Sequence, residues 1–161
     1  MNRSGVNSSW ELHLVDPSGF ARFVKSLSPV KQKTLEASID KILLVHGTDL
    51  IDGDLIKSLG GSLYEFRVGP TSTRMLNKAG EEGKTPHQKI AIRVFLTFEK
   101  NQVIVLLGSY DKGANDSKSK QQSEIEIARS LLKFWKITAA LSKLLLSLAA
   151  AAWVMFALAW M

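Results

Sequence analysis

The chain has 161 residues, contains no cysteine and carries a formal net charge of +6. This length suits one domain with a hydrophobic core. The lack of cysteine excludes disulfides and thiolate metal sites, and fits a reducing compartment such as the cytoplasm. The charge is uneven, because residues 1–56 sum to −1 and residues 57–136 sum to +6. A basic half on a small domain favours a polyanionic partner such as a nucleic acid.

The first third of the chain predicts a short strand followed by a helical hairpin. Residues 10–15 (WELHLV) alternate weakly between apolar and polar side chains, as a short strand does. Each of the two following segments begins with a capping residue and a proline, namely Asp16 with Pro17 and Ser28 with Pro29. These pairs are typical of helix starts, so two consecutive helices are expected.

The middle of the chain predicts three strands. Residues 62–68, 89–99 and 102–110 have strand-like patterns, whereas we expect 47–61 to be a connector and 69–88 a polar loop or excursion. Consecutive strands with short links favour an antiparallel meander with helices packed on one side. The predicted fold is therefore α+β: the helical hairpin packs on a small antiparallel meander, and a C-terminal helix closes the domain.

Three cationic residues are candidates for a common site. Arg67 and Arg93 lie on the non-core face of their strands, and Lys112 follows the end of the third strand. In a meander they would converge on one exposed sheet face. Cations around one point repel each other unless an anion is present, which indicates a ligand such as phosphate. The alternative is that Glu65 and Glu99 neutralise them in cross-strand ion pairs.

Nothing in the sequence predicts a metal ion or another cofactor. His13, His46 and His87 are scattered without the spacing of zinc ligands. The chain also contains no phosphate-binding glycine loop and no nucleophile elbow.

Four motifs, in their order and spacing, carry a family resemblance. They are LYEFRV (63–68), IRVFLTF (92–98), VIVLLGSYDKG (103–113) and QQSEIEIARSLLKFW (121–135). Together they resemble the RelE/HigB-like toxins of type II toxin–antitoxin systems, over about residues 10–136. The resemblance implies a metal-independent endoribonuclease that cleaves mRNA, generally on the ribosome, and is held inactive by a cognate antitoxin of the helix-turn-helix type.

The resemblance also implies roles for individual residues. Arg67, Arg93 and Lys112 match the family's catalytic cations, which stabilise negative charge when the ribose 2′-hydroxyl attacks the neighbouring phosphate. Lys112 is followed by Gly113, where many relatives have a second lysine. Tyr110 would orient or stack on a base.

Beyond this centre, Lys118 and Lys120 would contact flanking RNA phosphates. Two other hypotheses stay open: a ParE-like, non-enzymatic poison of DNA gyrase, and an inactive nucleic-acid-binding module.

The tail is not explained by the resemblance, which divides the chain into a domain (1–136) and a hydrophobic helical tail (137–161). Residues 144–161 carry no charge, and as a helix they would span about 27 Å, close to the core of a bilayer. Three interpretations remain open. The tail is a tether to the inner face of the membrane, a helix that packs on a partner or a second copy, or an aberrant extension.

Overall fold

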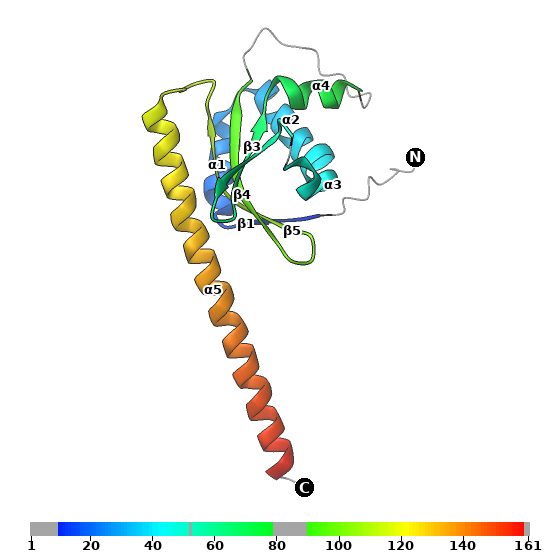
Figure 1. Cartoon of the computed structure of the whole chain (residues 1–161), viewed down its shortest axis with the longest axis vertical. Helices are drawn as coiled ribbons and strands as arrows, with labels where there is room; N and C mark the ends of the chain where they lie inside the picture. The colour runs from blue at the N-terminus through cyan, green and yellow to red at the C-terminus, as the bar shows by residue number, and fades with distance from the viewer. Residues whose placement is uncertain (1–9, 52, 79–89, 160–161) are drawn as a thin grey trace.

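The computed structural model describes residues 10–51, 53–78 and 90–159, with side chains up to residue 149. A mixed β-sheet has helices on both faces, and a long C-terminal helix runs past the sheet and projects from the domain (Figure 1). The predicted α+β class, with a helical hairpin, a meander and a closing helix, is confirmed.

The described residues form one five-stranded sheet in the order β1-β5-β4-β3-β2. Strands β2 to β5 form the predicted antiparallel meander, and β1 extends it by pairing with β5 in parallel. The strands are β1 (Glu11–Leu14), β2 (Ile56–Gly60), β3 (Leu63–Val68), β4 (Ile92–Glu99) and β5 (Val103–Asp111).

Strand β2 corrects the prediction that residues 47–61 form only a connector. It is an edge strand with exposed Lys57 and Ser58, so its sequence lacks the apolar alternation of a covered strand. The better signal was Gly60-Gly61, which have φ angles of 81° and 63° in the turn to β3. A glycine pair before a strand indicates a hairpin.

The helical hairpin forms as predicted and covers one face of the sheet. Asp16 caps its first helix, because Oδ1 accepts a hydrogen bond from the backbone N–H of Gly19 at 2.8 Å. The second segment stays helical to His46 through a π-helical stretch. The elements are α1 (Pro17–Ser26), α2 (Pro29–Ser38), η1 (Ile39–Leu43), α3 (Leu44–His46) and the 3-10 helix η2 (Gly47–Leu50).

Helix α4 (Pro70–Lys78) corrects the prediction of a polar loop over 69–88. Its first turn is held by Ser72 and Thr73, whose hydroxyls donate to the carbonyl of Gly69. Leu76 is its buried apolar anchor. A short helix with so few apolar residues has too weak a periodicity to be recognised. Residues 79–89 lie outside the described part of the chain.

Two hydrophobic clusters lie on opposite faces of the sheet. The larger one fills the space between the sheet and the helical hairpin. The smaller one lies between the other face and α5 (Lys118–Ala159), which corrects the expectation that helices pack on one side only. Its buried members are Leu63, Phe95, Val105, Leu107, Tyr110, Ala128 and Leu132.

Gly47 ends the second helical segment because no other residue fits there. Its φ angle is +49°, and a Cβ atom would lie 2.0 Å from the ring of Trp10. Trp10 in turn donates its backbone N–H to the carbonyl of Leu44 at 3.1 Å. The close approach of this ring to the helix end places the start of β1 beside the hairpin.

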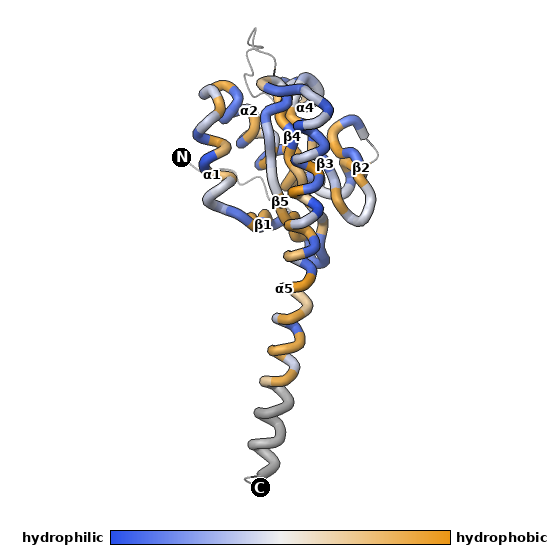
Figure 2. Tube along the Cα trace, turned by 90° about the vertical axis from the view of Figure 1, so that its left-hand side faces the viewer, coloured by the Kyte–Doolittle hydropathy of each residue, from blue (hydrophilic) through white to orange (hydrophobic). Residues whose placement is uncertain are grey.

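Among the side chains of α5 that the structure describes, up to residue 149, those that bind the domain lie in the first half of the helix. Arg129 Nη2 donates to the carbonyl of Leu59 at 2.6 Å, and Trp135 Nε1 donates to Glu99 Oε1 at 3.3 Å. Beyond them the helix projects away from the sheet (Figure 2). In the part of the chain that the structure describes, no helix is long and apolar enough to cross a membrane. The membrane-tether prediction for 144–161 rests largely on side chains outside that part.

Candidate functional site

Three of the predicted site residues form one row across the sheet. Arg67 on β3 and Arg93 on β4 are direct register partners, and Arg93 is in turn the partner of Tyr110 on β5. The row lies near the end of the sheet from which the chain leaves β5 for α5, at the top of Figure 1. The antiparallel meander therefore brings two arginines, far apart in sequence, onto neighbouring strands.

A buried carboxylate holds the two arginines. Glu65 is 1% exposed, and its Oε1 accepts a hydrogen bond from Arg67 Nε at 2.9 Å. Arg93 Nε lies 3.5 Å from the same oxygen, and Gln121 on α5 donates to Oε2 at 3.4 Å. Because a buried charge is costly unless it is paired, this carboxylate fixes the positions of both guanidinium groups.

The geometry resolves the alternative that Glu65 and Glu99 neutralise the arginines. It is correct for Glu65. Glu99 instead accepts a hydrogen bond from Trp135. Glu65, Arg67 and Arg93 therefore carry a net charge of +1 between them.

The arginines keep donors for a ligand. A guanidinium has five N–H donors, and Arg67 uses its Nε–H on Glu65. Arg93 Nε lies 3.5 Å from the same carboxylate and is buried without a hydrogen-bond partner among the described residues. Arg93 Nη1 also donates to the carbonyl of Ile92 at 3.1 Å. The Arg67 side chain is 37% exposed and that of Arg93 17% exposed. Arg67 is therefore the more accessible of the two side chains, and Arg93 is accessible only in part.

The ring of Tyr110 is part of the core on the α5 face. The ring stacks on Phe95 with centroids 6.0 Å apart, and the residue is 5% exposed, so the predicted stacking on an RNA base would require the ring to leave the core. The hydroxyl is buried without a hydrogen-bond partner among the described residues. Burial, and then the charge of Glu65, raise the pKa of Tyr110, so the hydroxyl keeps its proton.

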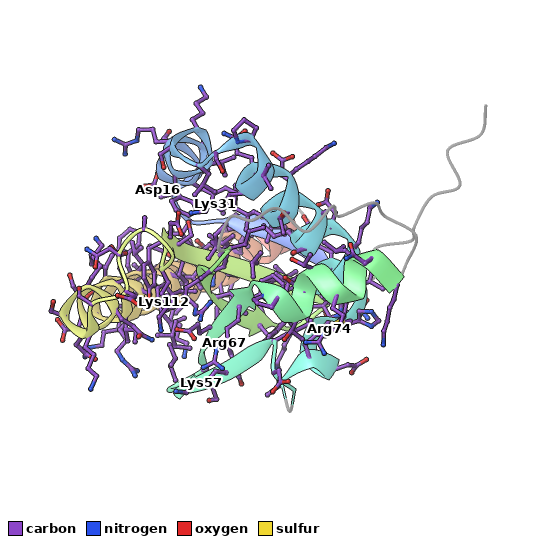
Figure 3. All side chains as sticks on the ribbon, turned by 90° about the horizontal axis from the view of Figure 1, so that it is seen from above. Asp16, Lys31, Lys57, Arg67, Arg74 and Lys112 are labelled. Carbon is purple, nitrogen blue, oxygen red and sulfur yellow. The ribbon has the colours of Figure 1, made fainter. Side chains whose placement is uncertain are left out.

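Lys112 lies just past the row, on a backbone held from both sides. Its predecessor Asp111 forms an ion pair with Lys31 of α2. Its successor Gly113 donates its N–H toward the carbonyl of Ala91 at 3.0 Å and toward Asp111 Oδ1 at 2.9 Å. The Lys112 side chain is half-buried, and Figure 3 shows it near the first turns of α5.

The two other predicted RNA contacts differ from each other. Lys118 is the first residue of α5 and is exposed. Lys120 is paired with Glu124 one turn further along the helix. An RNA phosphate would have to compete with Glu124 for Lys120. Lys118 has no such carboxylate partner among the described residues.

Lys57 is a further cation beside the row, to which the sequence pattern does not point. It is exposed on β2 and is the register partner of Glu65. In Figure 3 it lies on the same side of the sheet as Arg67. It was missed because β2 was expected to be part of a connector.

Among the residues described, no three histidine, aspartate or glutamate side chains gather as metal ligands do. His87 lies outside this part of the chain. In comparisons with known proteins, no family model matches the chain, and no curated protein or solved structure matches it. The resemblance to RelE/HigB-like toxins therefore stays a prediction from the motifs.

Proposed function

We propose that this chain is the toxin of a type II toxin–antitoxin system and acts as a metal-independent endoribonuclease on mRNA. The observation that carries the proposal is the pair of register partners Arg67 and Arg93, both positioned by the buried Glu65. Two forked cations on neighbouring strands present a surface that matches the oxygens of one phosphodiester.

In the proposed reaction the scissile phosphate lies across the two arginines. The 2′-oxygen of the ribose loses its proton and forms a bond to the adjacent phosphorus, while the bond from phosphorus to the 5′-oxygen of the next nucleotide breaks. The 5′-oxygen takes up a proton, so the products are a 2′,3′-cyclic phosphate and a 5′-hydroxyl. Negative charge builds on the non-bridging oxygens, where each well-aimed donor contributes about 3 kcal/mol.

The other residues of the site have supporting roles in this proposal. The hydroxyl of Tyr110 is buried at the edge of the row, so it would have to become accessible before it could donate a hydrogen bond to the RNA. Lys112 stabilises charge on the phosphate or on the leaving oxygen. Lys118 and Lys57 contact flanking phosphates, which positions the RNA without reading its sequence.

The setting of this activity follows from the same proposal. The substrate is mRNA on the ribosome, the compartment is the cytoplasm, and a cognate antitoxin of the helix-turn-helix type binds the domain and blocks the site. The basic balance of residues 57–136 supports a polyanionic substrate.

The test is inducible expression of the full chain with mapping of mRNA 5′ ends. The wild type is expected to stop growth and cleave mRNA, and Arg93→Ala to lower cleavage by about 100-fold or more. Arg74→Ala is the matched control, because it removes an exposed arginine on α4, away from the row (Figure 3).

Two outcomes would contradict the proposal. Intact mRNA together with blocked DNA supercoiling would replace it with the gyrase-poison hypothesis. Unimpaired growth at full expression would favour the inactive nucleic-acid-binding module.

A further inference from the structure

Helix α5 carries exposed apolar residues at a spacing of seven. Ile127, Phe134, Leu141 and Leu148 are 52%, 61%, 54% and 58% exposed. A spacing of seven residues keeps side chains on one narrow stripe only if the helix supercoils around another helix. In a surface helix without a partner, packing does not require apolar residues at this spacing.

A second set of exposed side chains completes the repeat. Ile137 and Leu144 are 60% and 56% exposed, and they follow Phe134 and Leu141 by three residues each. Alternating steps of three and four residues are the a and d positions of a heptad. We define the seam by its five members, Phe134, Ile137, Leu141, Leu144 and Leu148.

The seam is separate from the face that α5 uses to bind its own sheet. That face is formed by Ala128 and Leu132, which are buried, and by Trp135. The helix extends beyond the domain (Figure 2), and its described side chains there include exposed apolar residues up to Leu148. A helix gains most of its stability from packing of an apolar face, so this segment needs a partner.

We propose that the partner is a second copy of this chain, whose α5 packs along the seam in parallel. In that arrangement each seam residue packs against the same residue of the second copy, so the two helices pair in register. The positions that flank the seam between 138 and 147 are Thr138, Ala140, Leu145 and Ser147. None is charged, so two copies do not repel each other there, and no charge pattern selects a different helix.

Lys133 occupies the flanking position directly before Phe134, whereas the two following lysines lie on the outer side. Lys136 and Lys143 both fall at the position that follows the seam residue by two, on the outer side of a two-helix pair. In the resulting dimer the two domains lie side by side at the same end of the paired helices. The inference does not depend on the proposed ribonuclease activity.

The first test measures the mass of the full chain in solution by light scattering over a range of concentrations. A dimer is expected for the wild type, and Leu141→Lys should weaken its association at least 100-fold. The matched control is Leu146→Lys, which changes a more exposed leucine (71%) that lies off the seam. This control should associate as the wild type does.

A monomeric wild type would overturn the inference. Equal loss of association in both variants would also overturn it, because that result indicates a general apolar surface rather than a seam. Flotation of the wild type with phosphatidylglycerol vesicles, lost equally in both variants, would replace the second copy with a lipid surface.

A second test fixes the parallel register. The chain has no cysteine, so a single Leu144→Cys introduces the only thiol. Under mild oxidation it should form a disulfide-linked dimer, whereas Leu146→Cys should not. Absence of the link in Leu144→Cys, or equal linking of both variants, would contradict a parallel seam.

Discussion

The two faces of the sheet bury very different side chains. On the hairpin face every buried strand residue is apolar, for example Phe66, Val94 and Ile104. On the α5 face the apolar cluster shares the surface with the buried Glu65 and its arginines. The buried strand residues of the hairpin face are thus all apolar, and the charged pair on that side, Lys31 with Asp111, joins α2 to the end of β5. On the α5 face a buried strand carboxylate holds charged groups in fixed positions.

Strand β3 shows how one short sequence produces this difference. Phe66 and Val68 point to the hairpin, while Glu65 and Arg67 point to the α5 side. Alternation along a strand sends neighbours to opposite faces. A site built in this way takes its rigidity from the apolar face directly behind it.

The largest loss of stability is expected from a substitution on the hairpin face. Phe66→Ala removes a fully buried ring and leaves a cavity, so the free energy of unfolding should fall by about 3–5 kcal/mol. Urea denaturation followed by circular dichroism measures the loss. A change below about 1 kcal/mol would show that this face is not the main core.

A smaller effect is expected on the α5 face from Glu65→Gln. The amide keeps the shape of the side chain but removes the charge that pairs with both arginines, so the free energy of unfolding should fall by about 1–3 kcal/mol. Glu36→Gln, at an exposed position of α2, is the matched control and should change stability little. Equal effects of the two substitutions would remove the distinction between Glu65 and a surface carboxylate.

Removal of Arg129 tests how α5 is held on this face. Arg129→Ala deletes the hydrogen bonds to the carbonyls of Leu59 and Gly60. The free energy of unfolding should fall by about 1 kcal/mol, because the groups are exposed and water replaces the lost bonds. Faster hydrogen exchange in the first half of α5 is the accompanying measurement, and unchanged exchange there would contradict the docking role.

Tyr110→Phe is expected to change the free energy of unfolding least at neutral pH, because the hydroxyl has no hydrogen-bond partner among the described residues. Burial raises the pKa of Tyr110 in the folded protein, so above about pH 10 the unfolded chain ionises first. The wild type should therefore lose stability with rising pH more steeply than the variant. Parallel alkaline unfolding curves for the two proteins would contradict a buried, protonated hydroxyl.

The comparison of the two faces also shows what the sequence could reveal. The alternation in residues 62–68 and 89–99 was enough to place Arg67 and Arg93 on one face. It could not show that α5 covers part of that face. Helix α5 packs there through small and apolar residues, Ala128 and Leu132, whose partners are far away in the sequence.

The position of Tyr110 illustrates a different limit. A strict alternation from Val105 and Leu107 would send Tyr110 to the opposite face of β5. The pairing between β4 and β5 shifts where Phe95 opposes Gly108 but Leu96 opposes Leu106. This irregularity adds one residue to β5 and returns Tyr110 to the face of Phe95. The sign of such a bulge in the sequence is Gly108, an isolated glycine inside an apolar strand.

The most direct test of the central claim, that Arg67 and Arg93 together hold an RNA phosphate, is the salt dependence of RNA binding. Fluorescence anisotropy of a labelled single-stranded RNA gives the affinity of the full chain at several salt concentrations. Each of Arg67→Ala and Arg93→Ala should reduce the slope of log affinity against log salt by about 0.7, the value for one phosphate contact on single strands. Arg74→Ala should leave the slope unchanged. Equal slopes for the wild type and all three variants would contradict the claim.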